Sequence, residues 1–469
     1  MAPLFANHSC DPFAPRSSPC IVGSYVRYAV DARTPRHVQA ALEFARQHRI
    51  RLVVRNTGHD TAGRSTGAGA LAVWVHHMKD VAVVDDPTRS GEKALRLGAG
   101  VQGFEALAEA SKAGLVVMTA ACPTVGVAGA YTQGGGHSML STVHGLAADN
   151  VVSFEVVVPS GSLVETSRTV NPDLYWALTG GGGGTYGVVA AMTVRAYPDA
   201  KVSGASFEVT APGDDVDRIF EAVDAFHAAL PRIVDSGAMI VYHAGQGFIT
   251  TLAMTMFNKT KSEAEVTLEP FFSSIAANGY TIEVNYTGFP SYHDHYSHYW
   301  GPIPGGKAQV NAQLFGGRLI PRQALPNLGV TFRRLVALGV TFKGIGLDVS
   351  RFGGANAVLP QWRESIIQAS LALPWSYDRP FDDMVAEQKR ITTQIQPLIE
   401  AATPGAGAYM NEGNFQQPDF QETFFGANYG RLLRIKKQYD PEGLLFAVGG
   451  VGSEEWTVQG DGRLCRVDG

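Results

Sequence analysis

Apolar positions in the first hundred residues fall in short runs that are separated by polar turns and one amphipathic stretch. Between the first two runs, Thr34 and Pro35 mark a helix start, and apolar residues recur on one face of the helix that follows. This order predicts a compact βαβ unit. Its polar turn around His59 follows the carboxyl end of a strand, where open α/β sheets usually hold ligands. The predicted strands span residues 25–30, 52–54 and 71–75.

The pattern continues to about residue 198 with a second group of strands and short helices. Residues 182–187 match the Gly-X-Gly-X-X-Gly fingerprint of Rossmann dinucleotide sites. That fingerprint follows a strand and opens a helix, whereas this one follows a predicted helix and opens a strand, so we reject a Rossmann site. Strands are predicted at 94–97, 115–118, 151–158, 163–166 and 188–195, and helices at 102–113 and 174–178.

After Pro198 the strands alternate with longer helices. Many strands joined by hairpin-length or helical links predict an antiparallel sheet backed by helices, which is a second domain of α+β type. The last predicted helix, 424–439, is ended by Pro441. The other strands are predicted at 207–210, 239–242, 248–256, 282–286, 310–315, 340–349 and 366–373, and the other helices at 216–229, 261–276, 325–338 and 382–401.

Composition narrows the class of function. With 469 residues, of which 45% are hydrophobic and 17% charged, the chain can form two domains with separate cores. A net charge of -5 without a long basic run gives no sign of a nucleic-acid or anionic-membrane partner, and no apolar run approaches the roughly 20 residues of a membrane helix. The 53 glycines cluster at 134–136 and 180–184, which indicates backbone passing close to a ligand.

The N-terminal segment bears on whether the protein is secreted or cytosolic. Cys10 and Cys20 bracket a Pro-rich stretch with little apolar content, and a disulfide between them would fix it in place. The alternative is two unrelated thiols in a cytosolic protein. The N-terminus lacks a signal peptide, and Cys465 has no obvious partner. Together with three glycosylation acceptors, the pair favours a secreted protein in its mature form. The acceptors are Asn7, Asn258 and Asn285.

Two stretches carry the strongest motifs. Residues 51–66 run from a strand into a glycine-punctuated turn, and residues 121–137 contain the only cysteine in the middle of the chain. With motifs further along, they resemble the berberine bridge enzyme-like branch of the vanillyl-alcohol oxidase family, and the order and spacing agree across essentially the whole chain. The motifs are Arg55-Asn-Thr-Gly-His-Asp60, Cys122-Pro-Thr-Val-Gly126, Gly134-Gly-Gly136, Gly145-Leu-Ala-Ala-Asp-Asn150, Asn428-Tyr429 and Tyr439-Asp-Pro441.

The resemblance implies an α+β fold with a two-part FAD-binding domain of the vanillyl-alcohol oxidase (PCMH) type, in which two α/β subdomains bind the cofactor. A substrate domain, built on an antiparallel sheet backed by helices, is inserted into it. The expected boundaries are 1–200 for the FAD-binding domain, 201–407 for the substrate-binding domain, and 408–469 for the C-terminal segment that completes the FAD-binding domain.

The resemblance also implies that FAD is attached covalently at two ring positions, through His59 to the 8α-methyl carbon and through Cys122 to C6. A flavin tethered twice cannot dissociate or tilt, and the substitutions make its reduction easier. From the residues alone, the alternatives are a turn histidine bonded within its own loop and a cysteine that acts as a small buried apolar residue.

The remaining cofactor contacts follow from phosphate chemistry and from the resemblance. A pyrophosphate needs several backbone N–H donors in a concave turn, which residues 56–65 can supply. Glycines after Cys122 let the backbone approach the ring and ribityl chain. The segments around Asn150 and Asn428 match further contacts of the family. The candidate cofactor-binding residues besides His59 and Cys122 are Arg55, Asn56, Thr57, Gly58, Asp60, Gly63, Arg64, Ser65, Gly126, Val127, Gly129, Gly134, Gly135, Gly136, His137, Gly145, Asn150, Val151, Asn428 and Tyr429.

Three residues are the catalytic candidates. Val125 matches a family position over flavin C4a, where valine accompanies reactivity with oxygen and larger residues accompany dehydrogenases; the alternative is an ordinary loop valine. Relatives that oxidise carbohydrates or monolignols carry Tyr-X-Asn-Tyr, with the last tyrosine as the base, whereas this chain has Tyr409-Met-Asn-Glu412. Glu412 is the candidate base if partial burial raises its pKa towards neutrality, and the neighbouring Tyr409 is the other group that could take the proton. The alternative for Glu412 is a solvated or salt-bridged carboxylate.

We therefore expect an oxidase that moves a hydride from a small alcohol, phenolic or amine metabolite to flavin N5 and then to O2, giving H2O2. The alternatives are an oligosaccharide oxidase and a flavin-retaining cyclase or ligand-binding protein. The expected partners are a small-molecule substrate and O2, and a monomer is expected. His137 either contacts substrate or fixes its loop. His293, His295 and His298 do not repeat a metal-ligand spacing, so we expect no metal site and assign them to an active-site rim.

Overall fold

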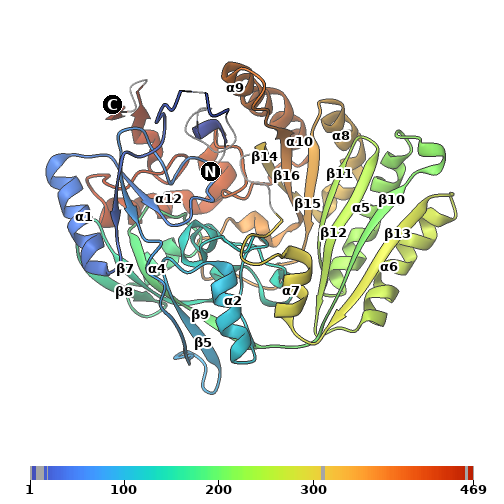
Figure 1. Ribbon diagram of the computed structural model, residues 1–469, viewed down its shortest axis with the longest axis horizontal. Coiled ribbons are helices and arrows are strands. Elements are labelled where there is room, and N and C mark those ends of the chain that lie inside the picture. The colour runs from blue at the N-terminus through green and yellow to red at the C-terminus, as the bar shows by residue number, and fades with distance from the viewer. Residues whose placement is uncertain (1–2, 7–14, 18, 308–311, 460–462, 468–469) are drawn as a thin grey trace.

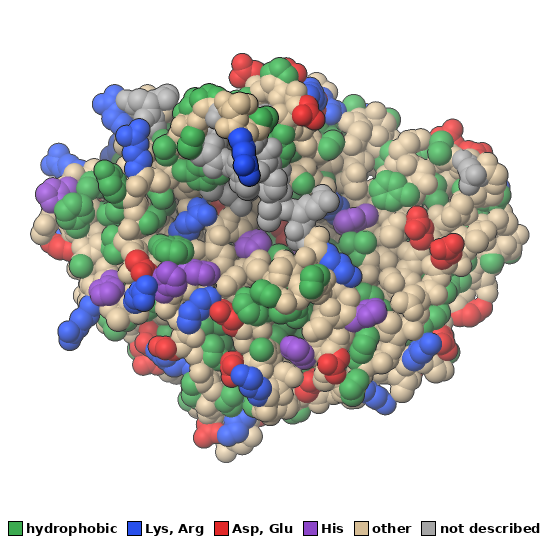
Figure 2. Space-filling view, viewed as in Figure 1, with side chains coloured by type: hydrophobic (Ala, Val, Ile, Leu, Met, Phe, Trp, Pro, Cys, Tyr) green, Lys and Arg blue, Asp and Glu red, His purple; other side chains and the backbone are tan. Residues whose placement is uncertain are grey.

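The computed structural model describes residues 3–6, 15–17, 19–307, 312–459 and 463–467. Two sheets and the C-terminal helices form the left half of the view in Figure 1, and a large sheet backed by helices forms the right half. Lys, Arg, Asp and Glu side chains are interspersed on the face seen in Figure 2. No helix in the described ranges is both long enough and apolar enough to span a bilayer.

The first sheet is the predicted βαβ unit. Its strands run parallel in the order β1 (Tyr28–Asp31), β3 (Leu71–Trp74) and β2 (Leu52–Arg55). Helix α1 (Pro35–His48) lies against it, with the apolar face of the helix buried in the same core as the strands. Thr34 occupies the N-cap position and Pro35 the first turn as predicted, although the Thr34 hydroxyl makes no capping bond. The turn that carries His59 follows β2 directly.

The second sheet is antiparallel. Its order is β4-β5-β9-β7-β8, and β6 also pairs with β9. Strand β4 was not predicted, and the predicted strand 115–118 is reduced to two residues. The strands are β4 (Val81–Asp85), β5 (Lys93–Gly98), β6 (Leu115–Val116), β7 (Val151–Val157), β8 (Leu163–Ser167) and β9 (Val188–Pro198), and the helices beside them are α2 (Gly103–Lys112), α3 (Ser141–His144) and α4 (Pro172–Leu178).

The third sheet confirms the antiparallel sheet backed by helices. Its order is β13-β10-β12-β11-β15-β16-β14, and every pair is antiparallel. Helices cover one face (Figure 1), where the second large core lies. The strands are β10 (Val202–Thr210), β11 (Met239–Gly245), β12 (Phe248–Phe257), β13 (Thr281–Phe289), β14 (Gln313–Pro321), β15 (Thr341–Gly346) and β16 (Ser365–Pro374), and the helices are α5 (Ile219–Asp235), α6 (Lys261–Ala276), α8 (Leu325–Ala337), α9 (Phe381–Arg390) and α10 (Gln396–Ala402).

Several boundaries differ from the predictions. The predicted helix 382–401 consists of α9 and α10, which are joined by a short π-helix (η7, Ile391–Ile395). The predicted helix 424–439 is divided into α11 (Phe420–Phe425) and α12 (Tyr429–Tyr439), because Gly426 between them adopts a φ of 53°. The other elements are η1 (Pro3–Ala6), η2 (Val127–Tyr131), η3 (Ala147–Asn150), η4 (Pro212–Asp214), η5 (Arg322–Ala324), η6 (Pro360–Arg363), η8 (Gly426–Asn428), η9 (Ser453–Glu455), α7 (Tyr292–Trp300), β17 (Trp456–Val458) and β18 (Leu464–Arg466).

The C-terminal segment packs on the first half of the chain. Leu445 forms a parallel bridge with Leu52 of β2 and lies in the core beneath α1. The buried Lys436 ammonium of α12 donates to the carbonyls of Leu445 at 2.7 Å and Thr185 at 2.8 Å, and it pairs with Asp440. These contacts join the last segment to β2 and to the glycine run. The domain boundaries at 200 and 408 stay predictions.

Candidate active site

The turn after β2 is held by side chains from neighbouring elements. Asn56 Nδ2 donates to the Ala99 carbonyl at 2.9 Å, its Oδ1 lies 3.0 Å from His76 Nδ1, and its carbonyl accepts from Trp74 Nε1 at 2.9 Å. Gly126 fits against this amide, because a Cβ there would lie 2.1 Å from Asn56 Nδ2. The Asn56 side chain is therefore used within the protein, so its predicted contact with the cofactor would use backbone atoms.

The rest of the turn, referred to below as the polar cradle, contains buried polar groups that have no hydrogen-bond partner among the described residues. Gly58, with a φ of 84°, packs on the Arg55 guanidinium, and the Asp60 carboxylate accepts from the Arg64 N–H at 2.6 Å. Arg64 Nε donates to the Val448 carbonyl at 2.9 Å. Among the described residues, Arg64 Nη1 and Ser65 Oγ are buried without a hydrogen-bond partner. Two unsatisfied buried groups suit a polar or anionic ligand such as a pyrophosphate or a flavin edge.

Gly63 is the second glycine of this turn that carries a positive φ, of 75°. A Cβ at Gly63 would lie 2.6 Å from the ring of Phe5, so the N-terminal segment contacts the turn there. Phe5 in turn packs edge-on against Phe415, with ring centroids 5.0 Å apart. Gly63 thus serves backbone geometry and packing, and its predicted contact with the cofactor stays a prediction.

His59 and Cys122 lie on opposite sides of one hydroxyl. Thr124 Oγ1 is 2.7 Å from His59 Nε2 and 3.6 Å from Cys122 Sγ, so residues 63 positions apart contact the same side chain. Burial lowers the pKa of His59 to about 4, which keeps the imidazole neutral near pH 7. Cys122 is free and half-buried. The structure therefore brings together the two residues for which a double flavin bond was predicted.

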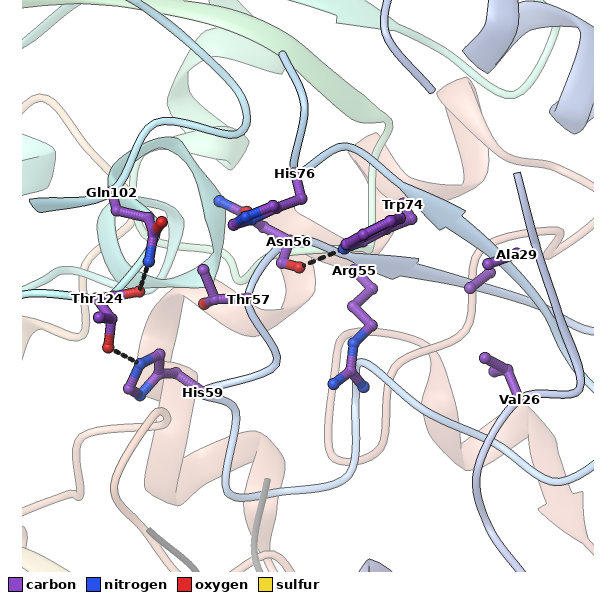
Figure 3. A pocket seen from close by; sticks show the side chains of 11 residues that line it. Val26, Ala29, Arg55, Asn56, Thr57, His59, Trp74, His76, Gln102 and Thr124 are labelled. Atoms are coloured by element: carbon purple, nitrogen blue, oxygen red, sulfur yellow. Dashed lines mark hydrogen bonds between the residues drawn. The ribbon is translucent and has the colours of Figure 1, made fainter. Parts of the chain in front are cut away.

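A pocket of about 520 Å³ opens beside this turn. Figure 3 shows His59 next to Thr124, and Gln102 of the α2 N-cap, whose Nε2 donates to the Thr124 carbonyl at 3.0 Å. The capping amide of α2 thus fixes the backbone that carries the Thr124 hydroxyl. The lining residues are Val26, Ala29, Arg55, Asn56, Thr57, His59, Ala72, Trp74, His76, Gln102 and Thr124.

Helix α7 supports the Cys122 loop from the other side. Tyr296 donates its hydroxyl proton to the carbonyls of Ala120 and Ala121, each at 2.9 Å. The expected active-site rim stays a prediction for His293 and His298, whereas His295 is buried in the helix interface with Tyr292 and Tyr296. His295 Nε2 bonds to Thr255 at 2.8 Å, and burial lowers its pKa to about 3. No cluster of metal-ligating side chains occurs among the described residues.

We predict that Tyr296→Phe destabilises the protein by about 1–2 kcal/mol, because two loop carbonyls lose their donor. Thermal unfolding with the cofactor bound measures this. Tyr299→Phe is the matched control, since Tyr299 lies on the same helix but bonds to Thr287 on β13, 2.9 Å away. Tyr296→Phe should also slow bond formation at Cys122, whereas Tyr299→Phe should not. Equal effects of both variants on that bond would contradict the role of Tyr296 as a support for the loop.

The triple glycine lies against the segment that carries Glu412. A Cβ at Gly134 would lie 2.7 Å from Asn411 Nδ2, which donates to the Ala130 carbonyl at 2.7 Å and to the Tyr409 hydroxyl at 2.9 Å. A Cβ at Gly129 would meet no atom within 4 Å, so backbone approach by a ligand is possible there. Gly135 and Gly136 have φ values of 121° and 77°, which this tight turn requires.

His137 and Glu412 form a hydrogen-bonded pair in the site. Their Nε2 and Oε1 atoms are 2.7 Å apart, and Glu412 Oε2 accepts from Ser370 Oγ at 3.3 Å. The expected rise in the Glu412 pKa is wrong. Burial does raise it, but the charge and hydrogen bond of His137, the Ser370 bond and the charge of Lys343 outweigh burial and lower the pKa of Glu412 below 4.5. Glu412 is therefore an oriented, ionised carboxylate, with 33% of its side-chain surface accessible.

Asn411 and Tyr409 lie next to the His137–Glu412 pair. His137 Nδ1 and Asn411 Oδ1 are buried without a hydrogen-bond partner among the described residues. The His137 ring packs edge-on against Tyr409, with centroids 5.5 Å apart. Burial, and then the charge of Glu412, raise the pKa of the Tyr409 phenol, so Tyr409 stays neutral. Of the two catalytic candidates, Glu412 is an ionised carboxylate that can accept a proton and Tyr409 is a neutral phenol, and their catalytic roles stay predictions.

Val125 and Val127 connect the Cys122 loop to the π-turn η2. The Val125 carbonyl accepts from Gly103 N–H at 2.9 Å, and Val127 N–H donates to the Val101 carbonyl at 3.0 Å. Val127 is buried, whereas Val125 is only partly buried. The Val125 side chain is half-exposed three residues after Cys122, and its role next to the flavin stays a prediction.

Other predicted cofactor residues bond within the protein. Asn150 donates to the carbonyls of His144 at 2.9 Å and Leu146 at 2.8 Å, and it accepts from the Tyr197 hydroxyl at 2.5 Å. Val151, next in the chain, begins β7 and its carbonyl accepts from a tyrosine hydroxyl. A Cβ at Gly145 would lie 2.8 Å from an Asp149 carboxylate oxygen. Contacts of these residues with FAD stay predictions and would use backbone atoms.

Asn428 and Tyr429 lie at the start of α12. Asn428 donates to the carbonyls of Ala357 and Val358 at 3.2 Å each. The Tyr429 hydroxyl bonds to Glu454 and accepts from Gly452 N–H at 3.2 Å. Their side chains thus anchor the C-terminal segment, and their contacts with the flavin stay predictions.

Sequence reasoning missed three residues of the site. Thr124 and Asn411 lay inside quoted motifs, so their positions were available although their roles were not. Ser370 had no signal, because a serine within a strand of the second domain is not distinguished by pattern or spacing. Only the fold places it against Glu412.

The polar cradle after β2, the contact of both His59 and Cys122 with Thr124, and the His137–Glu412 pair next to the triple glycine fit an FAD-dependent oxidoreductase. Family comparison agrees. Residues 26–167 match the FAD binding domain model, and residues 408–447 match the berberine and berberine-like model. The chain belongs to the berberine bridge enzyme-like branch of the vanillyl-alcohol oxidase-type FAD-linked oxidoreductases.

Three proteins illustrate the relationship. FAD-linked oxidoreductase ZEB1 of Gibberella zeae is 47% identical over 470 residues, which are 99% of this chain and 83% of that protein. The crystal structure of the VAO-type flavoprotein MtVAO615 from Myceliophthora thermophila C1 has a TM-score of 0.94 at 39% identity and covers 99% of this chain and 86% of that one. Glucooligosaccharide oxidase from Acremonium strictum, at 18% identity and a TM-score of 0.73 over 92% of this chain and 93% of that one, shares the fold.

Proposed function

We propose that this protein is an oxidase that carries FAD attached at both His59 and Cys122 and oxidises a small hydroxylated, phenolic or amine metabolite with O2, producing H2O2. The observation that carries the proposal is the Thr124 hydroxyl, which contacts both anchoring residues. Two nucleophilic side chains held on one hydroxyl suit attachment to two positions of one ring system. The unsatisfied Arg64 and Ser65 groups fit the polar parts of the same cofactor.

The chemistry of the two anchors supports the double attachment. A neutral imidazole has a free lone pair, and the low pKa of His59 keeps it neutral. Because Nε2 contacts Thr124, Nδ1 is the atom left for a bond to carbon. The glucooligosaccharide oxidase is described as holding a 6-S-cysteinyl, 8α-N1-histidyl FAD. We infer the same pair of bonds here, with His59 at 8α and Cys122 at C6.

FAD supplies a hydride acceptor and then returns both electrons to O2, which gives H2O2. The chain supplies the base. Glu412 accepts the proton of the substrate hydroxyl while the hydride leaves the same carbon, so one carbonyl group forms and the carboxylate becomes a carboxylic acid. His137 orients Oε1 of that carboxylate, and Ser370 orients Oε2. The neutral Tyr409 phenol next to His137 can donate a hydrogen bond to the substrate oxygen.

The proposal that O2 reoxidises the reduced enzyme rests on the small side chain of Val125. We predict that Val125→Leu slows reoxidation of the reduced enzyme by O2 about tenfold or more, which equals about 1.4 kcal/mol of barrier, because a larger side chain fills the approach next to Cys122. Stopped-flow mixing of reduced enzyme with O2 measures this rate. Val127→Leu is not a suitable control, because Val127 is buried; Val330→Leu changes an exposed valine instead. Unchanged reoxidation in Val125→Leu would remove Val125 from oxygen control.

We also propose that the protein is secreted and glycosylated. Two of its three acceptor asparagines, Asn258 and Asn285, have exposed side chains in the described structure. Asn7 and Cys10 lie outside the described residues, so the Cys10–Cys20 disulfide stays a prediction. Mass measurement before and after enzymatic deglycosylation tests this assignment, and an unchanged mass would contradict it.

A screen of oxygen consumption and H2O2 production tests the proposed function. The panel includes alcohols, phenols, amines and oligosaccharides, each with purified flavin-containing enzyme. We expect equimolar oxygen uptake and peroxide production with small hydroxylated compounds. Turnover with an artificial dye but none with O2 would contradict the oxidase. Faster oxidation of oligosaccharides than of small alcohols would assign the protein to the oligosaccharide oxidases.

A further inference from the structure

A row of side chains crosses four neighbouring strands of the seven-stranded sheet. In the order β11, β15, β16, β14, His243 pairs with Lys343, Lys343 with Ser370, and Ser370 with Gly317. Side chains of paired residues lie on the same face, with Cβ atoms about 5 Å apart. The row faces away from the helices, because Phe342, the residue before Lys343, is buried in the core beneath them.

This row ends at the candidate base. A Cβ at Gly317 would lie 2.5 Å from the Glu412 carbonyl oxygen, so the absence of a side chain lets the Glu412 segment rest on the sheet. Ser370, the next member of the row, donates to Glu412 Oε2 at 3.3 Å. Ser370 therefore bonds to the Glu412 carboxylate and is the cross-strand neighbour of Lys343, whose ammonium group reaches Gln313 at the start of β14.

Among the described residues, the half-buried Lys343 ammonium contacts neutral groups. Its Nζ donates to Gln313 Oε1 and lies 5.9 Å from the centroid of the Phe315 ring, and none of the described carboxylates lies within 4.0 Å of it. Burial lowers the pKa of Lys343, although the charge of Glu412 opposes this. Its cross-strand neighbour His243 is neutral near pH 7, because burial lowers the His243 pKa to about 4. A desolvated ammonium without an ion pair is stabilised by an incoming anion.

Deepening the proposed function, on which this inference rests, we propose that the natural substrate is a hydroxy acid whose carboxylate binds Lys343 while its hydroxyl lies at Glu412. The two charged groups then bind opposite ends of one molecule, and Ser370 is a strand neighbour of Lys343 that bonds to Glu412. Phe315 offers an aromatic surface to the carbon skeleton between those ends. The chemistry at the hydroxyl is that of the proposed oxidase and needs no further reactant.

The arrangement favours an acid over a neutral sugar. The hydroxyls of an oligosaccharide can hydrogen-bond to an ammonium, but they cannot compensate its charge. A carboxylate does both, and charge-assisted hydrogen bonds are about twice as strong as neutral ones. The position of Lys343 therefore acts on binding of the substrate, whereas Glu412 acts on the chemical step. Loss of Lys343 should raise KM for acids much more than it lowers kcat, because the charge of Lys343 is the smallest of the effects that lower the pKa of Glu412.

Binding of matched acid and amide probes tests the proposal. The probes are 4-(hydroxymethyl)benzoate and 4-(hydroxymethyl)benzamide, together with 4-hydroxybutanoate and 4-hydroxybutanamide. Binding to the flavin-containing enzyme under anaerobic conditions is followed by calorimetry. In the wild type we expect at least one acid to bind about tenfold or more tightly than its amide, since a hydrogen bond to a charged group is worth about that much.

Two lysine variants test whether Lys343 binds the carboxylate of the probes. Lys343→Gln should reduce the acid-to-amide preference to about one, while Lys389→Gln, which removes an exposed lysine of α9, should leave the preference intact. A wild type that binds no acid more tightly than its amide, or a preference that survives in Lys343→Gln, would overturn the hydroxy acid assignment. Both results leave the oxidase proposal standing if neutral alcohols still reduce the enzyme, so the two failures are distinguishable.

Discussion

Replacement of Glu412 by Gln is expected to slow anaerobic flavin reduction about 10²- to 10⁴-fold, the usual contribution of a positioned general base. The amide has nearly the same shape, and it can keep one hydrogen bond to each of His137 and Ser370, but it cannot accept the hydroxyl proton. Substrate affinity should change much less than the rate. Stopped-flow absorbance of the oxidised flavin measures both quantities.

The pH dependence of the wild type follows from the same group. The pKa of Glu412 lies below its ordinary value of 4.5, so the carboxylate is fully ionised at neutral pH. Its capacity as a base is lost only as the pH falls through that lowered pKa, and the reduction rate should be constant from neutral pH down to about 5 with respect to this group.

Glu422→Gln, on the exposed side of α11, is the control for Glu412→Gln. A reduction rate in Glu412→Gln equal to that of the control would remove Glu412 from the mechanism.

Removal of both flavin anchors is expected to abolish retention of flavin by the denatured chain. In His59→Ala the flavin should stay attached through Cys122, and in Cys122→Ala through His59. In the double variant, all flavin should pass into the supernatant after denaturation and precipitation. Both single variants should also turn over more slowly, because each ring substitution makes reduction of the flavin easier. Absorbance of the pellet and supernatant, with mass measurement of flavin peptides, separates these cases.

Cys465→Ala supplies the matched control for the cysteine, since Cys465 is the other free, half-buried thiol among the described residues. It should keep both flavin bonds. Thr124→Val probes the shared hydroxyl without removing either anchor, and we expect slower formation of both bonds. Release of flavin from the denatured wild type would contradict the double attachment.

Local patterns in the sequence were enough to predict the first sheet and the cofactor turn. The βαβ unit follows from apolar periodicity and from the Thr34–Pro35 helix start, which depend on neighbouring residues only. The motif around His59 and Cys122 likewise named the residues that the fold brings onto Thr124. The large antiparallel sheet was predicted as a type of structure, although its strand order depends on contacts between residues far apart in the chain.

Other features depended on tertiary contacts. Residues 292–300 are rich in Tyr and His, which have modest helix propensity, but Tyr292 and Tyr296 are buried on one face and so stabilise α7. A usable signal was present, since Ser291 caps the helix by accepting from Asp294 N–H at 3.1 Å. Strand β4 was missed because its apolar residues are partly exposed along an edge.

The direction in which the Glu412 pKa is shifted shows most clearly what could not be predicted from the sequence. Burial alone argued for a raised value, and burial does act in that direction. The sequence held no sign that His137, 275 residues away, would lie 2.7 Å from the carboxylate. The effect of a partner outweighs the effect of burial at this site, and partners of that kind are known only once the chain is folded.

The most direct test of the account follows the flavin through one complete cycle. Wild-type enzyme is mixed anaerobically with a substrate found in the oxygen screen, and air is then admitted while absorbance and peroxide are recorded. The account predicts that the yellow chromophore bleaches, that it returns in air, and that about one H2O2 forms per flavin reoxidised. Consumption of substrate without bleaching would contradict it and indicate a non-redox cyclase, and a chromophore that stays bleached in air would contradict the oxidase.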